Sequence, residues 1–251
     1  ITDLILRMAR DNTSWGYDRI QGSLANLGHV IAPNTVKNIL KRHGIEPAPE
    51  RQKRTSWNAF MKGHWDVMAA TDFFTVEVWT PRGLLTYYVL FVMQLKTSYV
   101  RIAGVTTSHN SAYMKQVARN LTDVSDGFLV NSRYLIMDRD TKYTEDFRDS
   151  LDREGVKAVR CPVRAPNCNA FAERFVRSIT EECLDRMILF GEASLRRALT
   201  EYVAHYHAER NHQGVDNRLL EPSGTSSAAN EAIYRRERFG GMLSYYYREA
   251  A

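Results

Sequence analysis

The sequence is poor in cysteine and contains no hydrophobic stretch that could cross a membrane. Its three cysteines, Cys161, Cys168 and Cys183, form no CxxC pair. An odd count without such a pair does not indicate a disulfide framework, so we expect reduced thiols and a cytoplasmic protein. The uncharged run at 84–95, about 12 residues long, suits a buried strand and is too short for a bilayer. No signal peptide is recognisable, and we expect no membrane partner.

Low-complexity tracts and internal repeats are also absent, while 44% of the residues are hydrophobic. That fraction is sufficient for a hydrophobic core and argues against a disordered chain. The 251 residues suggest one or two domains. A net charge of +5 makes nucleic acid a candidate partner, although a mildly basic surface is also common on proteins that bind none.

Residues 1–46 are predicted to form three short helices. Apolar residues recur at helical spacing, at Ile1, Leu4, Ile5 and Met8, then at Ile20, Leu24 and Leu27, and then at Val36, Ile39 and Leu40. Pro33 suits the first turn of the third helix, and the whole pattern resembles a helix-turn-helix. The outward side of that helix carries Asn34, Thr35, Lys37, Asn38, Lys41 and Arg42. These residue types suit contact with bases and phosphates, but they equally suit a solvated helix face.

Two basic segments flank the central part of the chain. Residues 47–63 have the composition of a linker and contain the cluster Arg51, Lys53 and Arg54. Basic linkers often follow phosphates, but most are flexible tethers. Residues 211–251 form a C-terminal extension that mixes tyrosine with Arg235, Arg236 and Arg238. This mixture suits DNA and a partner-chain interface equally.

Residues 64–210 predict one mixed α/β domain. Strands are expected at 65–80, 84–95, 99–105, 133–138 and 156–160, with helices after the third strand and at 144–154, 167–180 and 193–207. Ser108 or Asn110 is expected to cap the first of these helices. The first three strands form an antiparallel meander, and the later strands alternate with helices. We therefore expect a mixed five-stranded sheet that is flanked by helices.

Three acidic residues carry the candidate chemistry. Asp72 lies inside the first strand, Asp138 ends the fourth, and Glu173 lies on the helix at 167–180. Strand and helix positions of this kind can meet at one face of a mixed sheet, where three carboxylates cannot all stay ionised without a cation. Mg²⁺ and Mn²⁺ prefer such oxygen ligands, and two of these ions can support phosphodiester chemistry.

Each acidic residue also has an ordinary structural explanation. A single Asp at a strand end is usually a turn or cap residue, and Glu173 next to Arg174 could be a surface pair. Asp140, Asp146, Asp149 and Asp152 are expected to be solvated acids of this kind. His205, His207 and His212 suggest a zinc site only weakly, because no cysteine partner or tighter spacing accompanies them. It is the joint placement of the three acidic residues that favours a metal site.

The sequence resembles insertion-sequence transposases of the DDE class, which have a retroviral-integrase-type core. Asp72 lies in TDFF, Asp138 in IMDRDTKY and Glu173 in NAFAERFVRSI, with the last two at close to the family's usual interval. The segment YHAERNHQ, followed by Pro222, resembles the motif after the core, and WGYDRI resembles the helical region before it. His207 stands where such proteins often have Asn, and Cys168 where an aliphatic or small residue is usual.

This resemblance implies a ribonuclease-H-like fold and a homo-oligomeric, nucleoid-associated prokaryotic enzyme. It also implies that Asp72, Asp138 and Glu173 hold two Mg²⁺ or Mn²⁺ ions. The enzyme would cleave transposon-end DNA and join the 3′-hydroxyl to target DNA. Asn169 matches an Asn often found near the site, and Arg177 is a candidate for holding a DNA phosphate, because it shares a helix face with Glu173.

Two alternatives on the same fold stay open at this point. A ribonuclease-H-like nuclease would hydrolyse without joining, although the basic segments and the helix-turn-helix pattern disfavour it. A non-catalytic DNA-binding protein derived from a transposase would need no acidic triad, and the three acidic residues are all present.

Overall fold

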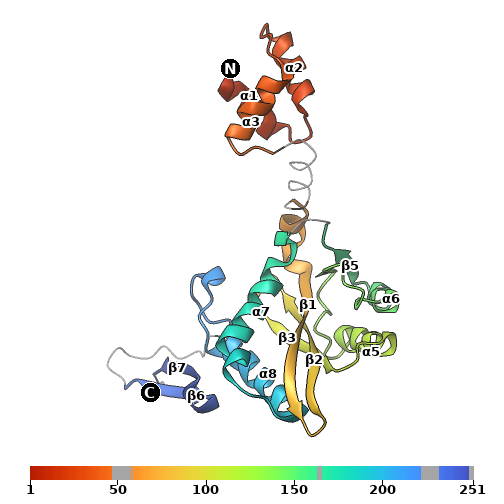
Figure 1. Cartoon of the computed structure of the whole chain (residues 1–251), viewed down its shortest axis with the longest axis vertical. Helices are drawn as coiled ribbons and strands as arrows, with labels where there is room; N and C mark the ends of the chain where they lie inside the picture. The colour runs from red at the N-terminus through yellow and green to blue at the C-terminus, as the bar shows by residue number, and fades with distance from the viewer. Residues whose placement is uncertain (47–56, 58, 163–165, 222–231, 249–251) are drawn as a thin grey trace. The chain divides into compact units, whose positions relative to one another are not determined.

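A computed structural model describes residues 1–46, 57, 59–162, 166–221 and 232–248. The chain divides into two compact units, Ile1–Trp65 and Asp66–Ala251, and each is described by itself (Figure 1). Within the described residues, no helix is both long enough and apolar enough to cross a membrane.

The first unit contains the three predicted helices, α1 (Thr2–Asp11), α2 (Tyr17–Asn26) and α3 (Pro33–Arg42). Their apolar faces meet in one core, in which Ile5, Ile20, Leu24, Val36 and Leu40 are fully buried. Leu27 was expected to point inward, but it follows the end of α2 and is largely exposed. The helical N-terminal region is therefore confirmed.

The predicted linker at 47–63 is only partly described. Arg51, Lys53 and Arg54 lie outside the described residues. Residues 59–64 are helical, and Trp65–Val67 then form a short 3₁₀ helix before the first strand.

The second unit is built on the mixed five-stranded sheet that the sequence predicts. Its strands are β1 (Met68–Thr80), β2 (Gly83–Gln94), β3 (Val100–Thr106), β4 (Tyr134–Met137) and β5 (Lys157–Arg160), in the order β3-β2-β1-β4-β5. The β1–β2 and β2–β3 pairs are antiparallel, whereas β1–β4 and β4–β5 are parallel. This arrangement confirms the ribonuclease-H-like fold class.

Helices cover both faces of this sheet (Figure 1). One face packs against α5 (Ser111–Thr122) and α6 (Glu145–Arg153), in a core that joins Leu90 and Leu135 to Met114 and Phe147. Asn110 caps α5 by accepting a hydrogen bond from the Tyr113 N–H, which decides between the two expected caps. The other face packs against α7 (Ala170–Glu182) and α8 (Gly191–Ala208).

The 3₁₀ helix η2 (Pro166–Asn169) precedes α7, so the α-helix begins three residues later than predicted. Phe175 is fully buried on α7, and its ring lies 4.7 Å from that of Phe91 on β2. This contact fixes α7 against the centre of the sheet.

A two-stranded hairpin, β6 (Tyr234–Arg238) and β7 (Leu243–Tyr247), is joined to α8 by buried charge. The side chain of Glu209, at the end of α8, is only 1% exposed. It accepts hydrogen bonds from Arg238 at 2.8 Å and Arg236 at 3.3 Å, and it contacts His205 at 3.0 Å. Arg238 also pairs with Glu201. Two arginines that were expected to contact DNA or a partner chain are thus engaged within the chain.

We expect Glu209→Gln to lower the free energy of unfolding by about 3 kcal/mol, because it removes the buried carboxylate with which Arg238 and Arg236 pair. Chemical denaturation at pH 7 would measure this loss. Burial alone would raise the pKa of Glu209. Hydrogen bonds from Arg238, His205 and Arg236 outweigh burial and lower this pKa to about 2. The stabilisation is therefore complete above the usual pKa of 4.5 and is lost as the pH falls towards 2.

Glu237→Gln is the matched control on the same hairpin. Glu237 pairs with Arg235 at 2.8 Å, and both side chains are nearly half exposed. Its loss should cost less than about 1 kcal/mol. Equal losses for the two variants would show that Glu209 does not anchor the hairpin.

Candidate active site

The strand register places Asp72 and Asp138 at equivalent positions on neighbouring strands. In the parallel β1–β4 pair, Ala70 lies opposite Ile136, and each aspartate follows two residues later. Neighbouring strands lie about 4.8 Å apart, and residues two positions apart share a face. The sheet therefore brings these two carboxylates to one place, where β4 ends and the chain leaves the sheet.

Glu173 reaches the same place from α7. It lies in the first turn of that helix and is exposed. Asp72, Glu173 and Arg177 line one open cavity of about 400 Å³. The structure therefore brings Asp72, Glu173 and the arginine that the sequence had singled out to one cavity, which Asp138 does not line.

The electrostatics of Asp72 show that these charges act on one another. The pKa of the Asp72 carboxyl is raised to about 6, mainly by burial and also by repulsion from Asp138, Glu173 and Asp140. The Phe73 N–H donates to Asp72 Oδ1 at 2.8 Å and partly offsets it. A carboxylate held in this way gains from a nearby cation more than a solvated one does.

The chemistry of these side chains fits a hard divalent cation, because all three are carboxylates. Asn169 adds a side-chain oxygen, Oδ1, that is buried and has no hydrogen-bond partner. In the part of the chain that is described, however, no three acidic, histidine or cysteine side chains are close enough to enclose a metal ion. The carboxylates thus share one site without forming a closed cage.

Asn169 was expected near the site as a DNA contact, but its side chain is buried. Its side chain is 6% exposed, and its Nδ2 donates to the backbone oxygen of Thr71 at 3.0 Å. This bond joins η2 to β1 directly beside Asp72. Contact between Asn169 and DNA stays a prediction, whereas its support of the β1 backbone is observed.

Sequence reasoning missed a group of residues beside the acidic residues. Asp140, expected to be solvated, is half-buried and forms an ion pair with Lys142. Burial alone would raise the pKa of Asp140. Hydrogen bonds from Lys142 outweigh burial, so the pKa of Asp140 lies below its usual value. Lys142 Nζ also lies 5.8 Å from the ring centre of Phe73 and 6.0 Å from that of Tyr88. The Asp-x-Asp-x-Lys spacing from Asp138 was the available signal.

The three histidines near the end of α8 have structural partners instead of a shared metal. His212 Nε2 forms a hydrogen bond with the backbone oxygen of Tyr206 at 2.7 Å, and His205 contacts Glu209. His207 Nε2 accepts from the Val100 N–H at 3.0 Å, and its ring stacks on Tyr99. Burial lowers the pKa of His207 to about 4, which keeps the ring neutral as this bond requires.

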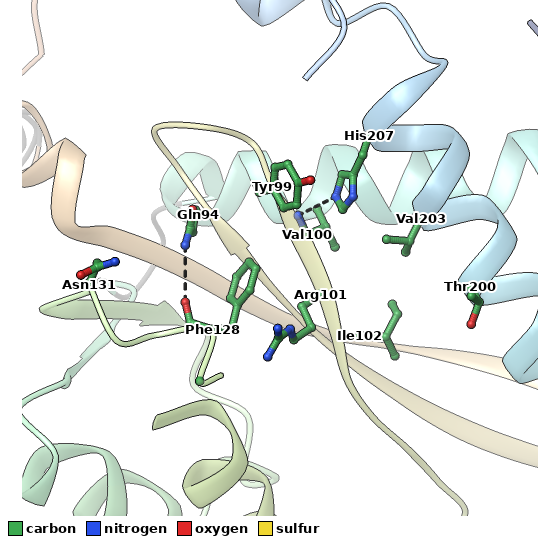
Figure 2. Close-up of a pocket in the computed structure, with 11 residues that line it drawn as sticks. Gln94, Tyr99, Val100, Arg101, Ile102, Phe128, Asn131, Thr200, Val203 and His207 are labelled. Carbon is green, nitrogen blue, oxygen red and sulfur yellow. Dashed lines mark hydrogen bonds between the residues drawn. The ribbon is translucent and has the colours of Figure 1, made fainter. Parts of the chain in front are cut away.

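His207 also lines a larger cavity, of about 580 Å³, at the β3 edge of the sheet. Figure 2 shows this cavity between β3, α8 and the loop that carries Phe128. None of the three acidic residues lines it. The candidate chemistry therefore belongs to the smaller cavity.

Comparison with known proteins gives one family match and one similar fold. Residues 154–219, which include Glu173, match the family model described as integrase core domain. Among solved structures, the chain is similar to the catalytic core domain of BIV integrase, with 12% identity and a TM-score of 0.42 over 59% of this chain and 88% of that one. No curated protein matches. Residues 154–219 thus resemble part of an integrase core domain.

We expect Asp72→Asn to raise the free energy of unfolding of the metal-free protein at pH 7.5 by about 2 kcal/mol. The raised pKa means that the folded chain resists ionisation of Asp72, so stability is lost as the pH rises from 3.8 to about 6. Asparagine removes that cost. Denaturation of the wild type and of Asp72→Asn in the presence of a chelator, at pH 7.5 and at about pH 4, would measure the difference in stability. This difference should vanish at the lower pH.

Asp149→Asn, at an exposed position on α6, is the control and should change stability little at either pH. A destabilised Asp72→Asn variant at pH 7.5 would contradict the electrostatic account of the site.

Proposed function

We propose that the protein is a DNA transposase or integrase that cleaves transposon-end DNA and joins the 3′-hydroxyl to target DNA. One observation supports this most directly. The β1–β4 register sets Asp72 beside Asp138, and α7 presents Glu173 to the cavity that Asp72 lines. Sites of this kind act by positioning and neutralising phosphates.

In this proposal, Asp72, Asp138 and Glu173 hold two Mg²⁺ or Mn²⁺ ions. When bound, such ions lower the pKa of the attacking hydroxyl and stabilise the leaving oxygen. Arg177, on the same cavity wall as Glu173, binds a DNA phosphate. Asn169 holds the β1 backbone beside Asp72 through its bond to Thr71.

The first unit would supply DNA contacts. Asn34, Thr35, Lys37, Asn38, Lys41 and Arg42 are all exposed on α3, while Val36 and Leu40 are buried on its other side. A helix that is packed on one side and offers amide and basic groups on the other suits a major groove. We further propose that the chain acts as a homo-oligomer on DNA, with transposon ends and target as its partners.

Glu173→Gln should abolish cleavage and joining while DNA binding persists, because the amide keeps the size of the side chain and loses its charge. A strand-transfer assay with labelled end DNA and Mn²⁺ would measure joining, and a mobility-shift assay would measure binding. We expect a loss of at least about 100-fold in joining. Recovery of label covalently attached to target DNA also separates a transposase from a nuclease that only hydrolyses.

Glu154→Gln is the control, since Glu154 is an exposed acid that directly follows α6 and does not line the cavity of Glu173. It should keep most of the activity. Cleavage that survives in Glu173→Gln would refute the assignment of Glu173 as a metal ligand.

Replacing Arg51, Lys53 and Arg54 with Gln should weaken DNA binding and make it less sensitive to salt. Each lost phosphate contact lowers the log–log slope of affinity against salt concentration by about one unit. Binding titrations at several salt concentrations would measure the slope. Arg119, Arg153 and Lys157, exposed on or near α5 and α6, provide a control triple with the same loss of charge. An unchanged slope in the test variant would identify the cluster as a plain linker.

A further inference from the structure

Four large apolar side chains form an exposed patch at the tip of the β1–β2 hairpin. Leu84 on β2 is 46% exposed and Trp79 on β1 is 52% exposed, whereas Ile188 and Phe190, in the segment before α8, are each 70% exposed. Single exposed apolar residues are common on proteins, but a contiguous group of this size marks an interaction surface. The function proposed above assigns no role to them.

Strand pairing places these side chains on one face. Trp79 lies opposite Leu84 in the β1–β2 pair, and a parallel bridge joins Trp79 to Phe190 on its other side (Figure 1). The Trp79 N–H donates to the Leu189 oxygen at 2.9 Å, which fixes the segment before α8 against β1. Paired residues on neighbouring strands lie about 5 Å apart with their side chains on the same face. Ile188 shares this face with Phe190, because Leu189 between them is buried.

The helices on this face of the sheet cover only the other end of β1. Ala69 and Phe73 pack in the core that contains α5 and α6, whereas Thr75, Glu77 and Trp79 are exposed. Helix α8 packs against the opposite face. Within the described part of the chain, the patch is therefore left open to a partner.

The chemistry and size of the patch suit a protein surface better than DNA. Contact with DNA depends on cations that neutralise phosphates, and the patch itself contains no charged side chain. Its four side chains expose on the order of 500 Å² of apolar area. Two such patches in contact would bury on the order of 1,000 Å², which is the area that a specific protein interface requires.

We propose that this patch binds the same patch on a second copy of the chain, across a two-fold axis. A two-fold contact needs no complementary surface elsewhere on the molecule. Charge favours this partner, because Glu77 lies two residues before Trp79, Arg82 lies in the turn after it, and both are exposed. A two-fold axis that crosses β1 near Trp79 brings Glu77 of each copy towards Arg82 of the other, so opposite charges meet at both ends.

Sedimentation equilibrium of the full chain without DNA provides the first test. We expect the wild type to dimerise reversibly. Trp79→Glu and Phe190→Glu should each raise the Kd of the dimer at least about 30-fold, because each places a carboxylate in an apolar contact. Circular dichroism should show an unchanged fold, since both side chains are at least half exposed in a single copy.

Val124→Glu is the matched control. Val124 is 88% exposed in the turn after α5 and lies outside the patch, so its replacement should leave the Kd unchanged. A wild type that stays monomeric at every concentration, or a dimer that both patch variants retain, would overturn the proposal.

The two charged residues test the two-fold arrangement. Glu77→Arg and Arg82→Glu should each weaken the dimer, and the double variant should restore it, because opposite charges then face each other again. Weakened single variants without restoration would contradict a two-fold axis near Trp79.

Cross-linking identifies what covers the patch. A photoreactive benzoylphenylalanine at position 190 is activated in a mixture of isotopically light and heavy copies, and the chain is then cleaved with trypsin. We expect mixed light–heavy products that contain peptide 63–82 or peptide 83–96, which carry Trp79 and Leu84. Products formed only within one copy, such as links to residues 1–46, would show that another part of the same chain covers the patch and would overturn the proposal.

The choice of a second copy rests on the proposed function, because two DNA ends require two catalytic cores. Sedimentation and cross-linking do not depend on that function. A dimer through this patch without strand transfer would support the present proposal and count against the function. Strand transfer at the wild-type rate by a monomeric Phe190→Glu variant would do the reverse.

Discussion

The parallel pairing of β1 with β4 is the constraint on which the rest of the site depends. Only three residue pairs define it, from Met68 opposite Tyr134 to Ala70 opposite Ile136. A shift of one position would turn either Asp72 or Asp138 to the opposite face of the sheet. The buried residues Ala69, Leu135 and Met137 prevent such a shift, because they belong to one core with α5 and α6. The hydrophobic core thus determines where the two carboxylates meet.

The position of Glu173 depends on packing on the other face of the sheet. Phe175 contacts Phe91 and lies 5.1 Å from the ring of Tyr206 on α8. Glu173 lies two residues before this anchor and is exposed. The helix is fixed at its buried side, while its first turn presents the carboxylate to the cavity. The positions of the three acidic residues are therefore fixed in different ways: two depend on strand pairing and one depends on the orientation of a helix.

Much of the fold could be predicted, because local patterns specify it. Alternation in β1, the uncharged run of β2 and the helical spacing around Val36 or Val117 each reflect which side chains are buried. The three acidic residues could be proposed as a site from the sequence because the motifs that contain them are local. The roles of Asp140, His207 and Glu209 could not be predicted, since each depends on a partner brought near by tertiary packing. Asn169 illustrates this limit best: its likeness to a family position identified the residue, but only the fold shows its bond to Thr71.

The charge cluster at Glu209 also explains why the last part of the chain matters to the domain before it. Glu209 is buried at the end of α8. Its cationic partners Arg236 and Arg238 lie on β6, which begins only at Tyr234. A shortened chain that stops near residue 221 would keep every strand of the five-stranded sheet but would lose the two arginines that pair with Glu209. The hairpin is therefore tied to the end of α8 by its charges, and any truncation before Tyr234 would separate Glu209 from both arginines.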